Sequence, residues 1–390
     1  MRLLIVQFAG DYRETVQRFA QGGGETYSAQ KYSVDAVAEM GKNIEEVAVL
    51  CCLTAENYQE ILPNGVRAIG AGFKQKINVN KLIELIKIQN PTHLVVRTPI
   101  LEIFQWAIQN KVQTLATLAD SFSTKGFGNK IRNYRLVTTL NNNQIEWIGN
   151  HGINSCRSLQ QIGVNPNKSI PWDWPATIAP DSFSPKMLSV TENPRNLIFV
   201  GSVSPSKGVG DVLAAVAQLK AKNVPVHLKI VGVGETNLFL AQAKQLKIEE
   251  SVTFLGGVEN QAVVHLMRKA DLVLIPSRHE YPEGFPMTIY EALCSRTPII
   301  ASDHPMFQNF LIHGVNAMIF PAMNSKALSE TIEKVLSDPT LYNSLSLASA
   351  EAWKQLQIPV KWTDMINRWL NHSEENGNWL FAHTLASKGY

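Results

Sequence analysis

The sequence predicts an α/β protein built from two doubly wound domains, and three observations carry this prediction. Strand-like and helix-like segments alternate along the chain, which is the pattern of parallel sheets with helices on both faces. The alternation starts twice, at LLIVQF near the N-terminus and again at NLIFVGS near residue 197. A length of 390 residues also exceeds what one ordinary hydrophobic core holds.

The strands expected from short buried runs divide into two series. The first series covers 3–8, 45–52, 92–97 and 112–118, and the second covers 196–202, 226–232, 252–257, 272–277 and 298–302. Between the series, residues 178–196 are rich in Pro, Ser and Asn and poor in periodicity, which is typical of a linker. We therefore expect one domain over 1–180 and a second over 190–369. The Trp-rich segment 370–390 is expected to close the structure as helices.

Composition excludes several classes of protein. The chain is 45% hydrophobic and 18% charged with a net charge of +3, which describes a soluble globular protein without the basic stripe of a nucleic-acid binder. Its four cysteines, Cys51, Cys52, Cys156 and Cys294, have no metal-ligand spacing and indicate reduced thiols of a cytosolic protein. The apolar N-terminus is too short for a signal peptide, and a strand from Leu3 is expected instead. No apolar run is long enough to span a bilayer.

Glycine-rich turns follow the predicted strands in both halves. They are QGGGET with Gly23 and Gly24, GSVSPSKG with Gly201, Ser202 and Lys207, IVGVGE with Gly234, and FLGGV, whose backbone from Leu255 to Val258 could face a flat ring. Singly, each is weak, because glycines often form plain turns and a lysine near a helix start is usually solvated. Their shared position at strand carboxyl ends, where doubly wound domains bind ligands, favours a binding site.

The segment EGFPMTIYE, residues 283–291, carries the most specific pattern. Gly284 permits a tight turn, Pro286 stiffens it, and the amides from Met287 onward open a helix that favours anions. Carboxylates such as Glu283 and Glu291 accept hydrogen bonds from vicinal diols, as in ribose and hexoses. The pattern indicates a site for a diphosphate or for sugar hydroxyls, although surface charge is the usual explanation for an arbitrary glutamate pair.

The second half resembles the retaining glycosyltransferases of family 4, which have the GT-B fold. The resemblance rests on GSVSPSKG, IVGVGE, VTFLGGV, IPSRHEYPEGFPMTIYEALCSRTPIIASD and HGVNAMIFP, in that order and spacing, and covers most of 195–370. Residues 283–291 are similar to the family's E-x7-E motif. The first half matches more loosely, through its first strand, the glycine loop with Glu25, and LATLADSF. The resemblance implies two Rossmann-like domains facing across a cleft, the first for the acceptor and the second for the nucleotide sugar, with a C-terminal helix crossing back to the first.

The resemblance implies a function: transfer of a hexose from a nucleotide-diphosphate sugar to a hydroxyl acceptor such as a glycan, a lipid or a small metabolite. A UDP-hexose is the favoured donor and GDP-mannose the alternative, with retention at the anomeric carbon and no cofactor or divalent metal. Glu283 would contact the donor sugar, Glu291 the ribose, and Lys207 the departing phosphate, and Asp120 completes the implied catalytic set. The donor-binding residues implied are Gly23, Gly24, Gly201, Ser202, Gly234, Leu255, Val258, Arg278, Gly284, Phe285, Pro286, Met287, Thr288 and Glu291.

Two positions depart from the family pattern. Ser202 stands where the family usually has Arg, so one phosphate cation is missing unless Arg278 or another basic residue replaces it. Ala119 stands where the family usually has His, next to Asp120. These departures keep two alternatives open, a catalytically weakened sugar-nucleotide-binding protein of the same fold and a nucleotide-sugar epimerase, although the first domain shows no acid/base set for the latter.

Three smaller features complete the expectations. Residues 123–136 gather Lys125, Lys130, Arg132 and Arg135 with aromatic residues, which suits either a solvated loop or transient contact with a membrane surface. We therefore expect a cytoplasmic protein, either free or peripheral to the inner face of a membrane. The PWDWP segment, with Trp172 and Trp174, is expected to pack at the hinge rather than stack on a sugar. Of the histidines, His279 is the one expected to line the cleft, and His151 is taken as an ordinary polar residue.

Overall fold

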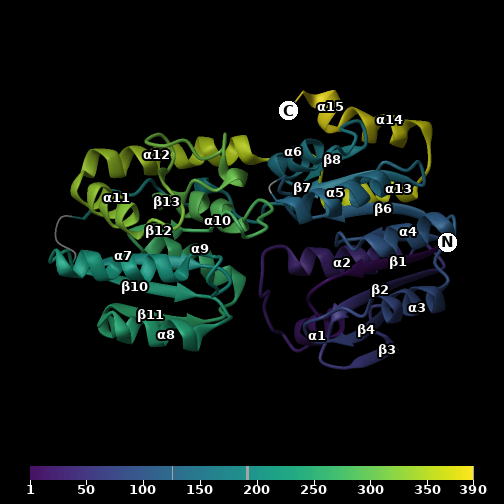
Figure 1. Ribbon diagram of the computed structural model, residues 1–390, viewed down its shortest axis with the longest axis horizontal. Coiled ribbons are helices and arrows are strands. Elements are labelled where there is room, and N and C mark those ends of the chain that lie inside the picture. Colours follow the sequence, from purple (N-terminus) through teal and green to yellow (C-terminus); the bar gives the residue numbers. More distant parts are fainter. Residues whose placement is uncertain (125, 190–192, 390) are drawn as a thin grey trace.

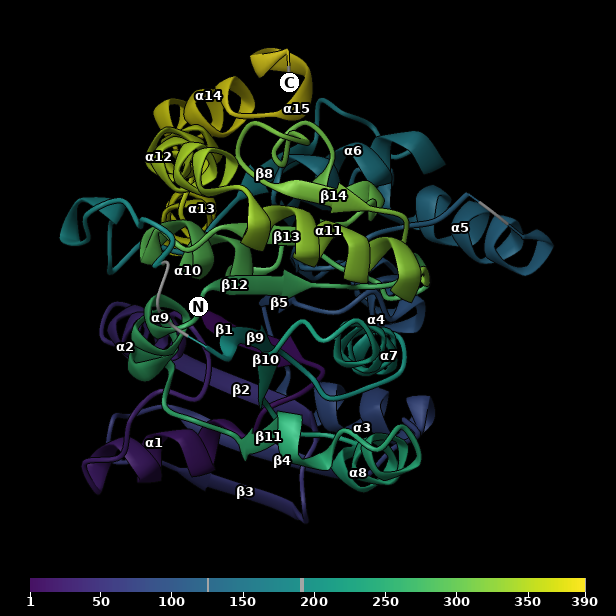
Figure 2. The ribbon, with the colours of Figure 1, turned by 90° about the vertical axis from the view of Figure 1, so that its left-hand side faces the viewer.

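The two series of strands fold into two separate sheets, one in each domain (Figure 1). The computed structural model describes residues 1–124, 126–189 and 193–389, and over these residues the sheets have eight and six strands. This confirms the predicted α/β class with two Rossmann-like domains. Figure 2 views the molecule from the C-terminal-domain side, with that domain's sheet in front of the N-terminal one.

The N-terminal sheet has the order β3-β4-β2-β1-β5-β6-β7-β8. Its strands are β1 (Arg2–Gln7), β2 (Glu46–Leu53), β3 (Asn57–Ile61), β4 (Arg67–Phe73), β5 (His93–Val96), β6 (Gln113–Leu118), β7 (Ile145–His151) and β8 (Ser169–Trp172). Its helices are α1 (Tyr12–Ala20), α2 (Gln30–Gly41), α3 (Val79–Gln89), α4 (Leu101–Gln109), α5 (Phe127–Leu140) and α6 (Ile153–Ile162). The β3 strand pairs antiparallel with β4, an edge hairpin that the sequence did not indicate.

The C-terminal sheet is parallel throughout, in the order β11-β10-β9-β12-β13-β14. Its strands are β9 (Arg195–Val200), β10 (Val226–Val231), β11 (Val252–Gly256), β12 (Leu272–Ile275), β13 (Ile299–Ser302) and β14 (Met318–Phe320). Its helices are α7 (Val209–Ala221), α8 (Thr236–Gln245), α9 (Asn260–Lys269), α10 (Met287–Ser295), α11 (Ser325–Ser337) and α12 (Pro339–Leu356). Short 3-10 turns occur at Pro180–Ser182, Glu249–Ser251 and Pro305–Phe307.

Alternate side chains of each central strand pack into hydrophobic cores on opposite faces of the sheet. In β1, Leu4 and Val6 enter one N-terminal core and Leu3 and Ile5 enter the other. The C-terminal sheet is covered on both faces in the same way. Continuous burial of the strands is what a doubly covered parallel sheet requires.

The chain returns to the N-terminal domain directly after α12. Helix α13 (Trp362–Leu370) buries Trp362, Met365, Ile366 and Trp369, an i, i+3, i+4, i+7 stripe, in the same core as Leu3 and Ile5. Helices α14 (Glu374–Ala382) and α15 (Leu385–Lys388) follow on the same domain, near α6 and β8 (Figure 1). The crossing therefore precedes the boundary near residue 370 that the sequence suggested, because this apolar stripe belongs to the first domain's core.

Each sheet has one point where the direction of winding reverses. In the N-terminal sheet, β1 lies between β2 and β5, and in the C-terminal sheet β9 lies between β10 and β12. The helices that follow the two central strands diverge there, which leaves a crevice outside the strand carboxyl ends. The reversal points lie beside Gln7 and Arg97 in one domain, and beside Gly201 and Ser277 in the other.

Candidate functional site

Lys207 and Glu283 meet at the reversal point of the C-terminal sheet. The Lys207 ammonium donates a hydrogen bond to Glu283 Oε1, and the Ser277 hydroxyl donates to the same oxygen at 2.7 Å. The side chains of Lys207 and Glu283 are only 13% and 6% exposed, and the Lys207 ammonium lies 4.3 Å from the ring centroid of Tyr281. A cation and a carboxylate are thus held together in a poorly hydrated place, where charges act strongly on a ligand.

Close packing of the Lys207 turn on β12 depends on glycine. Gly208 has a φ of +76°, and a Cβ atom placed there would lie 2.2 Å from the Pro276 carbonyl oxygen. An L side chain would clash and would also be strained in this left-handed conformation. Gly208 therefore fixes Lys207 against the end of β12 and brings it to Glu283.

The turn after Glu283 leads into α10, whose first residue is Met287. Pro286 precedes it in extended conformation, and none of the described side chains caps this helix end. The amides of Met287 and Thr288 lie at the positive end of the helix dipole, which favours an anion. Phe285 is buried, edge-to-face with Tyr290 and Phe310, so its side chain is part of the core and only its backbone faces the turn.

Glu291 lies on α10 and is held by the first residue of α9. Asn260 Nδ2 donates a hydrogen bond to Glu291 Oε1 at 2.7 Å. Burial raises the pKa of Glu291 to about 7, against an ordinary 4.5, and the Asn260 hydrogen bond partly opposes that rise. Glu291 also lines a cavity of about 40 Å³ together with Ser28, Trp174 and Met287. The second carboxylate of the pair is therefore poised to change charge near neutral pH.

Arg278, the candidate replacement for the cation missing at Ser202, is already paired. Its Nε and Nη2 both donate to the Asp211 carboxylate on α7, each at 2.8 Å. This bidentate pair ties the end of β12 to α7, and Ser202 itself is exposed after β9. The remaining predicted donor-binding residues, Gly201, Gly234, Leu255 and Val258, lie at or just beyond the carboxyl ends of β9, β10 and β11.

The EGFP turn packs against strand ends of the N-terminal domain. A Cβ atom on Gly284 would lie 2.8 Å from the Ala119 carbonyl oxygen and 3.8 Å from His151 Nδ1. A Cβ on Gly152 would lie 3.1 Å from Phe285 Cβ. The carboxyl ends of β6 and β7 therefore abut the turn of the other domain, and Gly284 is needed for that approach.

Asp120 follows Ala119 at this contact. Its backbone is fixed by Asn150, which accepts from the Asp120 amide at 3.3 Å and donates to the Asp120 carbonyl at 2.9 Å. Burial raises the pKa of the Asp120 carboxyl above its usual range. The predicted catalytic residue Asp120 is thus next to the interface with the Glu283 turn.

The glycine loop of the N-terminal domain contacts the start of α9 in the other domain. A Cβ atom on Gly24 would lie 2.8 Å from Glu259 Cδ, and the Asn260 amide donates to the Glu25 carbonyl at 2.8 Å. Gly23 packs on Arg18 within its own domain. The structure therefore brings the glycine loop to helix α9, which carries Asn260, the hydrogen-bond donor to Glu291.

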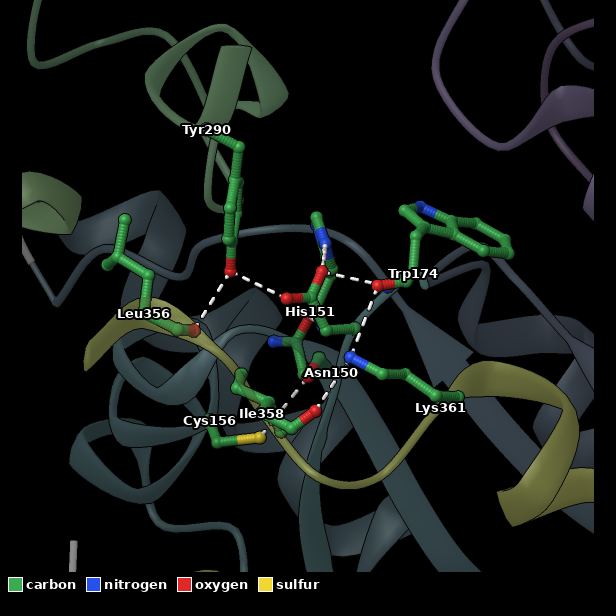
Figure 3. A network of polar contacts seen from close by, with 9 residues as sticks. Asn150, His151, Cys156, Trp174, Tyr290, Leu356, Ile358 and Lys361 are labelled. Atoms are coloured by element: carbon green, nitrogen blue, oxygen red, sulfur yellow. Dashed lines mark hydrogen bonds and ion pairs between the residues drawn. The ribbon is translucent and has the colours of Figure 1, made fainter. Parts of the chain in front are cut away.

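A buried network centred on Asp173 joins the two domains. Figure 3 shows its partners His151, Trp174 and Tyr290. Asp173 follows β8 and accepts from Tyr290 on α10 at 2.6 Å, and its other oxygen lies 3.0 Å from His151 Nε2. The Tyr290 hydroxyl also contacts the Leu356 carbonyl at 3.1 Å. Burial first, and then the Asp173 charge, raise the pKa of Tyr290 well above its ordinary value, so its hydroxyl keeps the proton that it shares with Asp173.

The Asp173 backbone holds the chain as it crosses between domains. Its amide donates to the Val360 carbonyl at 3.0 Å, and its carbonyl accepts from the Trp362 amide at 3.2 Å. Trp172 is fully buried with its ring centroid 5.0 Å from that of Trp174, so the expected packing role of PWDWP is confirmed for Trp172. The network places His151 at the site, whereas the sequence gave no reason to single it out.

Sequence reasoning missed several residues that complete the site. They are Ser277, Asn260, Tyr281, His151, Asp173 and Tyr290. His151 ends β7 and Ser277 follows β12 by two residues, and this position at a strand's carboxyl end is a signal that could have drawn attention to them. His279, expected to line the cleft, is exposed and pairs with Asp303 at 2.8 Å. Lys125 of the basic segment lies outside the described residues.

Two features are absent from the described residues. Residues 1–124, 126–189 and 193–389 contain no group of three or more His, Cys, Asp or Glu side chains arranged to hold a metal ion. In the same residues, none of the helices has the length and apolarity needed to cross a bilayer.

The sequence of the C-terminal domain is similar to that of a known protein family. Residues 182–352, less than half of the chain, match the sequence model of the glycosyl transferases group 1. The phosphatidyl-myo-inositol mannosyltransferase of Mycobacterium leprae is 30% identical over 180 residues, which are 46% of this chain and 47% of that protein. The match thus spans about half the length of this curated relative.

Solved structures extend the likeness to nearly the whole chain. Sucrose-phosphate synthase from Thermosynechococcus elongatus superposes with a TM-score of 0.71 at 16% identity, covering 95% of this chain and 98% of the other. Anabaena HepE in complex with UDP-glucose does so with a TM-score of 0.66, with the same identity and coverage. The chain therefore has the fold of the GT-B glycosyltransferases, and its C-terminal domain carries the sequence signature of glycosyl transferases group 1.

Proposed function

We propose that this protein is a retaining glycosyltransferase that moves a hexose from a nucleotide-diphosphate sugar to a hydroxyl acceptor. The observation that carries the proposal is the buried Lys207–Glu283 pair at the reversal point of the C-terminal sheet, facing strand ends of the other domain. A site between two domains that holds a cation, two carboxylates and a free helix N-terminus suits a diphosphate joined to a polyhydroxylated ring.

In this proposal each part of the donor has its own contacts. The diphosphate lies at the N-terminus of α10, where Lys207 balances its charge. Glu283 accepts hydrogen bonds from hexose hydroxyls, and Glu291 accepts them from the ribose. Gly23 and Gly24 bring the N-terminal domain up to the diphosphate. These charges are supplied by the chain itself, so the proposed reaction needs no divalent metal and no cofactor.

The proposed chemistry breaks the bond between the anomeric carbon and the β-phosphate oxygen. The nucleoside diphosphate departs with the electron pair, and the acceptor oxygen bonds to the anomeric carbon from the same face. The acceptor proton passes to the departing phosphate, whose developing charge Lys207 stabilises. Positioning by the two domains accounts for the rest of the rate enhancement.

A UDP-hexose is the favoured donor, and GDP-mannose is the alternative. The UDP-glucose complex of HepE supports a uridine donor, and the name of the mycobacterial mannosyltransferase supports a mannosyl one. The acceptor we propose is a glycan, a lipid or a small metabolite. For a lipid, helix α5 offers a surface with Ile131 and Tyr134 exposed at 51% and 74% beside Lys130, Arg132 and Arg135. We place the protein in the cytoplasm, with transient membrane contact through this helix.

A second candidate is a sugar-nucleotide-binding protein with weakened catalysis. One observation favours it: Arg278 is engaged by Asp211, so it does not supply the second phosphate cation missing at Ser202. Both candidates bind a nucleotide sugar, and turnover separates them.

A donor panel tests the proposal. Purified protein is incubated with UDP-glucose, UDP-galactose, UDP-N-acetylglucosamine, GDP-mannose and ADP-glucose, and released nucleotide is measured beside calorimetric binding of UDP, GDP and ADP. We expect slow donor hydrolysis with one nucleotide class, matched by micromolar binding of that nucleotide. Binding without turnover for any donor would support the second candidate, and the absence of both would refute a nucleotide-sugar site.

A further inference from the structure

Arg97 directly follows β5 at the reversal point of the N-terminal sheet, and the proposed donor site does not use it. Its Nη1 donates to Gln7 Oε1, at the end of β1, at 3.1 Å. The Gln7 amide nitrogen donates to the Gly10 carbonyl at 3.1 Å and to Cys51 Sγ at 3.3 Å, so the Gln7 oxygen is turned to Arg97. The guanidinium is therefore held in a fixed place at the crevice of the domain.

Two tryptophans flank this guanidinium. Its Cζ lies 5.0 Å from the ring centroid of Trp362 and 5.7 Å from that of Trp174. Both rings provide cation–π contact, and neither supplies a negative charge. Trp174 also lines the small cavity that Glu291 lines, so Arg97 contacts a side chain that borders the proposed donor site.

Some other arginines of the chain pair with carboxylates, whereas Arg18 and Arg157 donate to neutral oxygens as Arg97 does. Arg13 lies 3.6 Å from the Tyr58 ring centroid, and its Nη2 is 2.8 Å from Glu56 Oε1. Arg67 pairs with Glu46 and Arg278 with Asp211. No carboxylate of the described part of the chain pairs with Arg97, and burial lowers its pKa. Arg97 is partly exposed, and an anionic ligand would supply the counter-ion that the described residues do not.

We propose that Arg97 binds an anionic group, a phosphate or a carboxylate, carried by the acceptor. The planar guanidinium offers two parallel N–H donors, which is the geometry that such groups accept. Arg97 follows β5, and the neighbouring strand β6 leads to Ala119, which packs against Gly284 of the other domain. An acceptor anchored at Arg97 would therefore lie on the N-terminal-domain side of the donor site. This inference rests on the proposed function and adds to it the substrate class, an acceptor with a negative charge.

The test measures binding of matched probes by calorimetry in the presence of saturating UDP. The probes are glucose, glucose 6-phosphate and glucuronate, with glycerol and glycerol 3-phosphate as a second pair without a ring. We expect at least one anionic probe to bind tenfold or more tightly than its neutral counterpart. A better fit of the phosphate or of the carboxylate then names the group.

Variants assign the effect to Arg97. Arg97→Met should reduce the preference for the anionic probe to within about twofold, and Arg97→Lys should retain part of it because the charge remains. Arg368→Met is the control, since Arg368 also lies over a tryptophan, Trp379 at 4.3 Å, and also donates to an amide oxygen, Asn376 at 2.9 Å, but on α13. It should keep the full preference. Thermal unfolding of each variant confirms that it is folded.

Two results would overturn the inference. Equal binding of charged and neutral probes to the wild-type protein would show that the acceptor site has no anion preference. An equal loss of UDP and probe affinity in Arg97→Met and Arg97→Lys would assign Arg97 to the donor. Absence of donor turnover would instead refute the proposed function. The calorimetric preference for anionic over neutral probes is a separate measurement, which tests the role of Arg97.

Discussion

The Lys207 ammonium donates a hydrogen bond to the Glu283 carboxylate although the two residues are 76 positions apart in the chain. Lys207 comes from the turn after β9 and Glu283 from the turn after β12, and adjacent parallel strands bring the two turns together. The pair is therefore a direct product of the sheet order, and it organises the site before any ligand binds.

Replacement of one member of this pair should destabilise the protein. Lys207→Met leaves the Glu283 charge buried, with Ser277 as its remaining hydrogen-bond donor, and we expect a loss of about 3 kcal/mol in the free energy of unfolding. The double variant Lys207→Met/Glu283→Gln should recover part of that loss, because no buried charge remains. Urea denaturation of the single and double variants measures the coupling, and strict additivity would contradict it.

Glu283→Gln should lower turnover sharply and leave nucleotide binding within about twofold of the parent. The amide keeps the shape but loses the charge that the sugar end of the site needs, and the ribose and diphosphate contacts remain. Glu280→Gln is the matched control, since Glu280 is exposed on the same loop. Equal activity of Glu283→Gln and the parent would refute the assigned role.

Because the pKa of Glu291 is raised, we expect both the stability of the protein and its nucleotide binding to depend on pH. Its pKa rises from 4.5 to about 7 in the folded state, so the folded protein holds this proton between those values. Its contribution to stability is full below pH 4.5 and is lost as the pH rises through about 7. Glu291→Gln should therefore gain stability relative to the parent above pH 7, and chemical denaturation at pH 4.5 and pH 8 checks this.

Nucleotide affinity should rise with pH, whereas the stability contribution of Glu291 falls, because the ionised carboxylate is the better acceptor for ribose hydroxyls. Between pH 6 and pH 8 the ionised fraction rises by about tenfold, and UDP affinity should rise by up to that factor. The Glu291→Gln variant retains only the pH dependence of UDP itself. Glu291→Ala should weaken binding by about 1–3 kcal/mol, and calorimetry that finds parent and variant alike would count against the ribose assignment.

Gly284→Ala should impair closure of the domains. The added methyl would lie 2.8 Å from the Ala119 carbonyl oxygen, so the EGFP turn must move away from β6. We expect a drop in turnover of tenfold or more with a larger radius of gyration by small-angle X-ray scattering. Gly377→Ala is the control, since a Cβ there meets nothing within 4 Å. A compact and active Gly284→Ala variant would argue against a closed catalytic state of this geometry.

Tyr290→Phe should loosen the junction at Asp173. The variant removes a hydrogen bond of 2.6 Å to a buried carboxylate, a loss of about 1.5–3 kcal/mol, and leaves the ring in place. Hydrogen exchange should increase at the crossing segment around Val360 and Trp362, which the Asp173 backbone holds. Unchanged exchange and unchanged stability would show that the network does not restrain the crossing.

The sequence was sufficient for features that depend on local pattern. Buried runs such as LVLIPS predicted most of the strands. The turns with Lys207 and Glu283 were predicted at strand carboxyl ends, where the structure has them, and Glu291 lies on the helix that follows the second turn. Five strands of the described residues were missed: the side chains of β3 are mostly exposed, glycines interrupt the apolar runs of β4 and β7, and β8 and β14 have only four and three residues. The return of α13 was placed too late, because its stripe of Trp362, Met365, Ile366 and Trp369 shows an amphipathic helix but not which domain it covers.

Only the tertiary structure decided how side chains are partnered. Arg278 looked free for a phosphate in the sequence, and the fold pairs it with Asp211. His151 looked ordinary, and the fold sets it between Asp173 and the Gly284 turn. Spacing along the chain determines which residues share a strand end or a helix face. Sheet order and domain contact decide which residues from different strands meet, because they bring together segments that no local pattern connects. They also decide which charge, such as that of Arg97, has no carboxylate partner among the described residues.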